Sequence, residues 1–179
     1  MGDNYIKGKA DAREYKGFTL SSLYDEYFDK IARYAYVRIG HRADAEDIAG
    51  EVFLKALQSL KSYKERGVPM QAWLFKIAHN LVIDYFRKRQ KQKTVSIDEV
   101  EIEGGVNPAM VAERNMEIEQ MKKGMEQLTR EQREVLMLRF FGGLSSREAG
   151  QVLHKSDGAV REMQRAAIEK LRNLLSIED

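Results

Sequence analysis

Residues 144–172, LSSREAGQVLHKSDGAVREMQRAAIEKLR, contain two short helical patterns separated by the turn HKSD. The first pattern spans Ser146 to Leu153, and the second begins near Asp157. Their apolar positions fall at helical spacing: Ala149, Val152 and Leu153 in the first, then Val160, Ala167 or Ile168, and Leu171 in the second. A turn this short places the second helix at the surface, where it can enter a DNA major groove about 12 Å wide. The stretch therefore predicts a helix-turn-helix.

Local signals support these two helices. Ser145 with Glu148 forms a capping box, in which each residue satisfies a backbone N–H of the other. Gly150 lies where the two helices would approach each other, and a residue without a side chain permits that approach. The outward positions near the second helix are Lys155, Ser156, Ala159, Arg161, Glu162 and Arg165. Arginine can bond guanine edges or phosphates and glutamate can accept from cytosine, but helical hairpins also occur in proteins that bind no DNA.

Helical periodicity also dominates the rest of the chain. Apolar residues recur every three or four positions in four further segments, which we expect to be helices over about 18–35, 44–60, 73–86 and 111–127. The third pattern places Trp73, Ile77, Leu81, Val82 and either Tyr85 or Phe86 inward, and the second places Ile48, Val52, Phe53, Ala56, Leu57 and Leu60 inward. Thr129 with Gln132 forms a second capping box, and Gly142 and Gly143 end the helix that follows. No convincing strand pattern is present, so the predicted fold class is all-α.

Composition limits the functional classes. The 179 residues carry 30 basic and 28 acidic side chains, so the net charge of +2 does not identify a partner by itself. There is no cysteine, which excludes disulfides, thiolate zinc sites and a cysteine nucleophile. No apolar run approaches the roughly 20 residues that cross a bilayer. We expect a cytoplasmic protein with no cofactor and no membrane insertion.

The chain divides into two helical domains. Residues 94–112 are acidic, contain Gly104, Gly105 and Pro108, and lack a sustained apolar period. We interpret them as a flexible acidic linker between a domain at 18–93 and a domain at 113–179. Residues 1–17 are polar, and we expect a disordered tail.

Four segments in this order resemble the extracytoplasmic-function sigma factors of bacterial RNA polymerase: LYDEYFDKIARYAYVRIG, DAEDIAGEVFLKAL, AWLFKIAHNLVIDYFRKR and the segment from Leu128 to Arg172. The resemblance covers about residues 18–175. It implies a two-domain initiation factor, with sigma-2 and sigma-4 domains, that is not an enzyme. Such a factor would bind core RNA polymerase at the beta-prime clamp helices and beta flap, recognise minus-35 and minus-10 promoter elements and help melt the DNA. An anti-sigma factor is a further expected partner, and no small-molecule substrate is expected.

The acids Asp44, Asp47 and Glu51 are spaced three and four apart, so they share one helix face. The resemblance implies that this face docks on the clamp helices. Two other readings compete: an ordinary solvated face near a helix N-terminus, and a carboxylate metal site as in helical nucleotide hydrolases. The metal site would need a second acidic set on a facing helix, which the sequence does not supply.

The resemblance assigns minus-10 recognition to the loop from Tyr63 to Pro69 and to the helix after it. Tyr63 and the backbone around Gly67 would form a pocket for a flipped base, with Lys64 beside them, and Asn80 offers a donor and an acceptor to a base edge. Arg87, Lys88 and Arg89 would hold phosphates. Asp84 would pair with Arg87 or Lys88, Trp73 would be a core residue, and His79 would be a polar surface residue.

The resemblance also assigns minus-35 recognition, to Arg147, Lys155, Ser156, Ala159, Arg161, Glu162 and Arg165. The chain departs from the family at His154, where a glycine commonly ends the first helix of the motif. Asp98, Glu99, Glu101 and Glu103 form a negative strip in the linker, which would either follow the RNA-exit path of the polymerase or act only as a solubilising spacer. Two other functions remain open: a stand-alone helix-turn-helix regulator and a helical metal-dependent nucleotide hydrolase.

Overall fold

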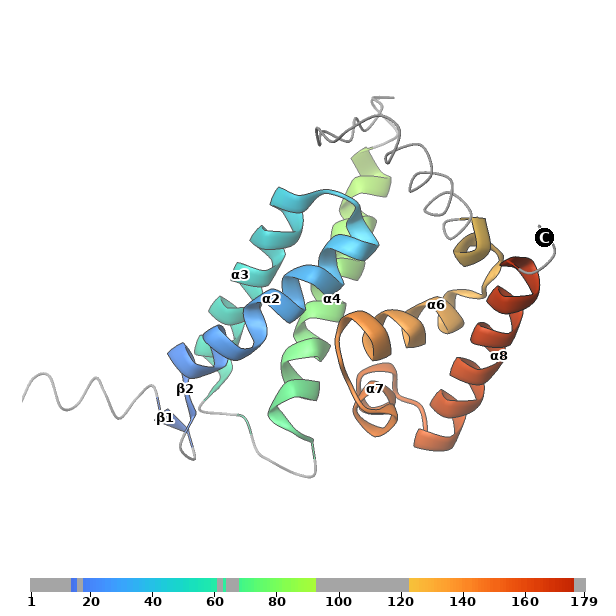
Figure 1. Cartoon of the computed structure of the whole chain (residues 1–179). Helices are drawn as coiled ribbons and strands as arrows, with labels where there is room; N and C mark the ends of the chain where they lie inside the picture. Colours follow the sequence, from blue (N-terminus) through green and yellow to red (C-terminus); the bar gives the residue numbers. More distant parts are fainter. Residues whose placement is uncertain (1–13, 16–17, 61–62, 64–67, 93–122, 176–179) are drawn as a thin grey trace, which may run out of the picture.

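The computed structural model describes residues 14–15, 18–60, 63, 68–92 and 123–175, and these residues are almost entirely helical (Figure 1). The all-α prediction is confirmed. The described strands are the two-residue pair Glu14–Tyr15 (β1) and Phe18–Thr19 (β2), which are antiparallel with Tyr15 opposite Phe18. The helical elements are α2 (Leu20–Ile39), α3 (Arg42–Ser59), α4 (Met70–Gln92), α6 (Arg130–Leu136), the π-helix η2 (Met137–Phe141), α7 (Ser146–Leu153) and α8 (Asp157–Leu175), with a further helical segment at 123–127.

Several predicted features lie outside the described residues. They are most of the N-terminal tail (1–13 and 16–17), Lys64 and Gly67, the acidic linker 94–112 with its four acids, and the predicted helix up to residue 122. No helix in the described part of the chain combines the length and the apolarity that a bilayer-crossing segment needs.

Helices α2, α3 and α4 form the N-terminal bundle (Figure 1). Thr19 caps α2 through a capping box with Ser22, and Gly40 ends this helix in the left-handed region at φ 78°. The inner face of α3 is buried as predicted, with the exception of Leu57, which is 42% exposed. The prediction for Leu57 is wrong because apolar periodicity alone does not show where the buried face of a helix ends. On α4, Tyr85 packs against the core and Phe86 is exposed.

Helices α6, α7 and α8 form the C-terminal domain, and here the sequence predicts the local structure closely. Both predicted capping boxes are present, at Thr129 with Gln132 and at Ser145 with Glu148. Helix α7 has the predicted bounds and α8 begins at the predicted residue. A Cβ atom on Gly150 would lie 2.5 Å from the carbonyl oxygen of Lys155, so the turn of the motif does require glycine at this position.

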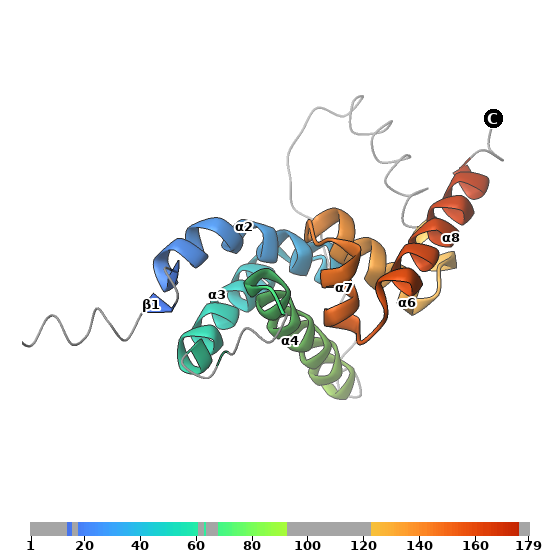
Figure 2. The same cartoon turned by 90° about the horizontal axis from the view of Figure 1, so that it is seen from below.

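The two domains pack against each other, with α7 against α4 and η2 against α2 (Figures 1 and 2). One buried apolar cluster includes Leu74 and Phe75 from α4 together with Leu138 and Leu144 from the C-terminal domain. Gly142 brings the backbone close to this contact, since a Cβ atom there would lie 2.8 Å from a ring carbon of Phe75. The side-chain amide of Gln71 also donates a hydrogen bond to the Gly142 carbonyl over 3.4 Å. The described part of the chain therefore forms one closed body.

Candidate functional site

The predicted acidic face of α3 is present, but its three members differ. Asp47 and Glu51 are exposed, and Glu51 has an ion pair with Lys55 on the same helix at 3.6 Å. Asp44 is half-buried and accepts a hydrogen bond from the Tyr85 hydroxyl over 2.6 Å. Burial raises the pKa of Tyr85, and the hydrogen bond to the Asp44 carboxylate adds to this effect. The structure therefore leaves two of the three acids, Asp47 and Glu51, available to a partner.

An exposed apolar pair extends this acidic face. Leu54 follows Glu51 by three residues, so both lie on one side of the helix, and Leu54 is 62% exposed. Leu57 lies three residues further along. Sequence reasoning did not assign Leu54 to a site and placed Leu57 in the core. The sequence gives only a weak indication that Leu54 belongs to a binding surface, because one leucine outside the apolar period is common on any helix.

The base of the predicted minus-10 loop is built around Tyr63. Its side chain is buried, its hydroxyl donates a hydrogen bond to the Val68 carbonyl, and its ring centroid lies 4.9 Å from that of Trp73. Trp73 is itself half-buried against the main core, in agreement with the prediction for it. The side chain of Tyr63 thus links the start of the loop to Val68 near its end. Asn80 is exposed on α4.

The basic end of α4 is partly anchored by neighbours. Arg87 forms an ion pair with Asp84 at 2.9 Å, as the sequence predicts. Arg89 donates a hydrogen bond to the Tyr85 hydroxyl over 3.2 Å, so the tyrosine contacts both this basic end and Asp44. Lys88 is exposed. These cations lie at the C-terminus of the helix, where the helix dipole favours positive charge.

His79 is not a surface residue, and that prediction is wrong. Its ring is half-buried, with Nδ1 lying 3.1 Å from the Tyr34 hydroxyl and 3.3 Å from Oε2 of Glu134. Arg38 contacts the same group, donating to the Tyr34 hydroxyl over 2.8 Å and forming an ion pair with Oε1 of Glu134. Burial raises the pKa of Tyr34 well above its ordinary value, so the phenol keeps its proton. We call Tyr34, Arg38, His79 and Glu134 the interdomain charge cluster, since Glu134 belongs to the C-terminal domain and the other three to the N-terminal bundle.

The predicted minus-35 residues lie on α7, at the start of α8 and along the first half of α8. Ser156 accepts a hydrogen bond from the backbone N–H of Ala159 and so caps the helix, while Ala159 and Arg147 are exposed. The charged members of the set pair locally: Lys155 with Glu131 at 2.7 Å, Arg161 with Asp157 at 2.9 Å, and Arg165 with Glu162 at 2.7 Å and Glu169 at 3.1 Å. The hydrogen bond and charge of Arg165 lower the pKa of the Glu162 carboxyl. The pairs of Arg161 and Arg165 are exposed and therefore weak, and a nucleic acid binding here would exchange them for contacts to bases and phosphates.

Comparison with known proteins identifies the family. Residues 23–92 match the family model described as Sigma-70 region 2, and residues 124–173 match the model described as Sigma-70, region 4. The chain is 33% identical over 172 residues to the ECF RNA polymerase sigma factor BldN of Streptomyces coelicolor, covering 94% of this chain but 62% of BldN. It is 36% identical over 134 residues to the ECF RNA polymerase sigma factor ShbA of Streptomyces griseus, covering 72% of this chain and 70% of ShbA.

The fold has solved counterparts too. The sigma factor RpoE in complex with the anti-sigma factor NepR from Bartonella quintana superposes with a TM-score of 0.64 at 23% identity, covering 89% of this chain and 98% of that one. Fold and sequence together define a two-domain transcription factor of the sigma-70 type. The chain belongs to the extracytoplasmic-function RNA polymerase sigma factors.

Family membership favours the sigma factor over the two other functions that the sequence left open, the stand-alone regulator and the nucleotide hydrolase. Among the described residues, no three His, Cys, Asp or Glu side chains lie together in a way that could hold a metal ion. The acidic face of α3 lies inside the match to region 2, and the helix-turn-helix lies inside the match to region 4.

Proposed function

We propose that this protein binds core RNA polymerase, directs it to promoters through minus-35 and minus-10 elements and promotes melting of the DNA, without being an enzyme itself. The observation that carries the proposal is the combination of two matched regions in one chain, with an exposed acidic face in the first and a helix-turn-helix in the second. A plain DNA-binding regulator has no need of the first region.

The acidic face would dock on the beta-prime clamp helices through Asp47 and Glu51, with Asp44 in a lesser role because Tyr85 already occupies its carboxylate. Leu54 would extend the contact, since an exposed leucine beside two acids suits a partner that is basic and partly apolar. The beta flap would contact the C-terminal domain.

The promoter contacts would divide between the domains, with 18–93 acting at minus-10 and 113–179 at minus-35. Lys64, Gly67 and Asn80 would receive a base at a loop that the buried side chain of Tyr63 supports, while Arg87, Lys88 and Arg89 would hold phosphates. Arg147 and the residues around the start of α8 (Lys155, Ser156, Ala159, Arg161, Glu162 and Arg165) would read the minus-35 duplex. The acidic linker 94–112 would connect the two domains.

A protein partner that keeps the factor inactive is part of the proposal. The solved relative from Bartonella quintana is held by an anti-sigma factor, and a similar partner here would cover surfaces that the polymerase or the DNA needs. The protein would act in the cytoplasm, where its polymerase is.

In vitro transcription with core polymerase over a promoter library tests this function. We expect specific transcripts that require the protein, and weak binding to duplex promoter DNA when polymerase is absent. Tight sequence-specific duplex binding without any polymerase-dependent transcript would instead indicate a stand-alone regulator. Magnesium-dependent release of phosphate or pyrophosphate from nucleotides would indicate a hydrolase.

A further inference from the structure

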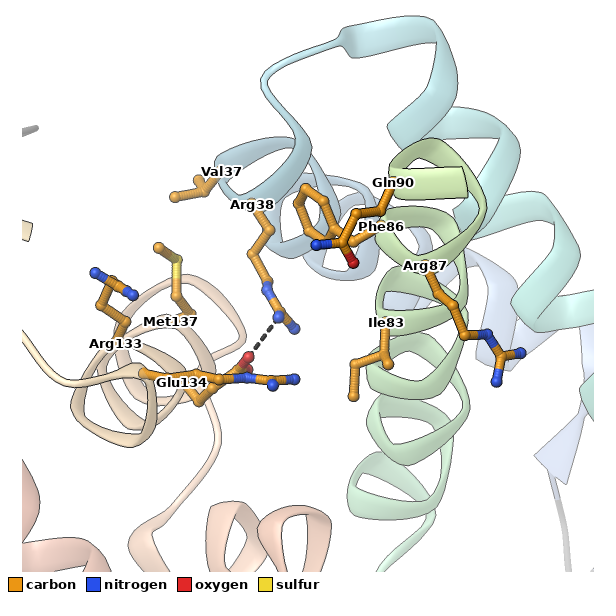
Figure 3. Close-up of a pocket in the computed structure, with 10 residues that line it drawn as sticks. Val37, Arg38, Ile83, Phe86, Arg87, Gln90, Arg133, Glu134 and Met137 are labelled. Carbon is orange, nitrogen blue, oxygen red and sulfur yellow. Dashed lines mark hydrogen bonds and ion pairs between the residues drawn. The ribbon is translucent and has the colours of Figure 1, made fainter. Parts of the chain in front are cut away.

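The contact between the two domains contains a buried ion pair that neither promoter recognition nor polymerase binding explains. Glu134 is a charged residue buried to 7% exposure, and its charged partner Arg38 comes from the other domain. Figure 3 shows Arg38 extending from α2 across the gap towards Glu134 on α6. Burying a charge is costly unless it is paired, so the closed arrangement depends on this pairing being intact.

The interface has two unlike halves. On one side Phe75, Gly142 and Leu144 pack closely, and this half is apolar. On the other side the domains leave an open pocket of about 520 Å³, whose walls include Ile83 and Phe86 of α4 and Met137 of η2. The Arg38–Glu134 pair borders this pocket (Figure 3). Interfaces between domains that are partly polar and incompletely packed resemble transient interfaces, which separate and re-form.

The dimensions of the closed body conflict with the proposed function. Positions −35 and −10 are about 25 base pairs apart, which is roughly 85 Å along B-DNA at 3.4 Å per base pair. A compact chain of this length has a radius of gyration of about 16 Å, hence a diameter of about 40 Å. With α7 packed on α4, one molecule cannot place its two domains on both elements. The domains must separate before a promoter is bound.

We propose that the closed arrangement is an autoinhibited state of the free protein and that the interdomain charge cluster (Tyr34, Arg38, His79 and Glu134) holds it closed. The proposal rests on the proposed function, because the separation of the two promoter elements is what makes the closed state inhibitory. A charge cluster suits an interface that must open, since water solvates Arg38 and Glu134 again once the domains separate. Opening an entirely apolar interface would instead expose its whole apolar area to water, which is unfavourable.

The first test measures the distance between the domains in the free protein. Because the chain has no cysteine, fluorescent labels can be attached through Asp25→Cys on α2 and Asn173→Cys on α8, both of which are exposed positions. We expect one compact population for the labelled protein. Glu134→Lys places two cations face to face and should shift most molecules to a longer distance, and Glu134→Gln should produce a smaller shift in the same direction.

Matched variants separate the interdomain pair from a general loss of structure. Adding Arg38→Glu to Glu134→Lys restores opposite charges and should recover the compact population. Glu131→Gln removes a carboxylate from the same helix whose ion pair with Lys155 lies within the C-terminal domain, and should leave the distance unchanged. Far-UV circular dichroism should show unchanged helix content in every variant. The proposal is overturned if the unmodified protein is already extended, or if neither Glu134 variant extends it.

The second test concerns inhibition and uses core polymerase. Glu134→Lys should lower the concentration of factor needed for half-maximal transcription at least threefold, and the double variant should return it to the original value. An extended Glu134→Lys protein with no gain in transcription would show that closure is not inhibitory. The distance measurement contains neither polymerase nor DNA. It can therefore show that the closed state is absent even if the protein is an active sigma factor.

Discussion

The hydroxyl of Tyr85 donates a hydrogen bond to the carboxylate of Asp44 over 2.6 Å, which joins the end of α4 to the start of α3. This contact divides the three acids that the sequence groups together, because it occupies Asp44 and leaves Asp47 and Glu51 exposed. Equal spacing on a helix therefore does not mean equal availability to a partner.

The first prediction compares Asp47→Lys with Asp44→Asn in binding to core polymerase. Asp47→Lys should weaken binding about tenfold, equivalent to about 1.4 kcal/mol, because it reverses an exposed charge on the proposed docking face. Asp44→Asn should weaken it less than about threefold. Titration of labelled protein with core polymerase gives both affinities, and equal losses for the two variants would contradict the division of the face.

A second prediction concerns the turn of the helix-turn-helix. Gly150→Ala would bring a Cβ atom within 2.5 Å of the Lys155 carbonyl oxygen, which is backbone and cannot move aside cheaply. We expect the free energy of unfolding to fall by about 1–3 kcal/mol, the usual cost of overpacking a tight site. Urea denaturation measures the change. Gly158→Ala is the matched control: nothing lies within 4 Å of its added Cβ, so it should leave stability equal or higher.

The local structure of the C-terminal domain was predictable because its signals are local. Ser145 and Glu148 cap a helix whose bounds match the apolar period, and Gly150 marks the close approach at the turn. The position of His79 could not be predicted, for the opposite reason. Its partner Glu134 lies 55 residues away in another domain, and no periodicity or spacing predicts that a histidine and a glutamate so far apart will meet.

The predicted site shows the same difference between local signals and contacts of residues far apart in the sequence. The acids of α3 and the outward face of α8 follow from helical geometry, so their placement could be deduced from spacing. That Tyr85 occupies Asp44, and that Leu57 lies outside the core, depends on how neighbouring helices pack. The exposed Leu54 gives no signal in the sequence until the buried face of α3 is known.

A third prediction follows from the one non-glycine residue with positive φ in the described part of the chain. His154 ends α7 at φ 56° and ψ 42°, where a residue with a Cβ atom loses about 1–2 kcal/mol. His154→Gly relieves this strain but gives the unfolded chain more freedom, which costs about 0.5–1 kcal/mol. The net expectation is a gain of about 0.5 kcal/mol in unfolding free energy, measured by urea denaturation. A loss of stability would mean that the exposed imidazole makes an interaction worth more than the strain.

The last prediction tests whether the basic end of α4 holds phosphates. Lys88 is exposed, whereas Arg87 has an ion pair with Asp84 and Arg89 a hydrogen bond to Tyr85, so Lys88 is the cation most directly available to DNA. Lys88→Glu should weaken the complex of polymerase, factor and promoter. The slope of log K against log salt should become shallower by about 0.7–0.9, because one phosphate is no longer neutralised by the protein. Filter binding at several salt concentrations measures that slope.

Lys123→Glu makes the same charge change at an exposed position outside the predicted contacts and should leave the slope unchanged. If both variants change the slope equally, the effect comes from overall charge, and the assignment of phosphate contacts to this helix end is wrong.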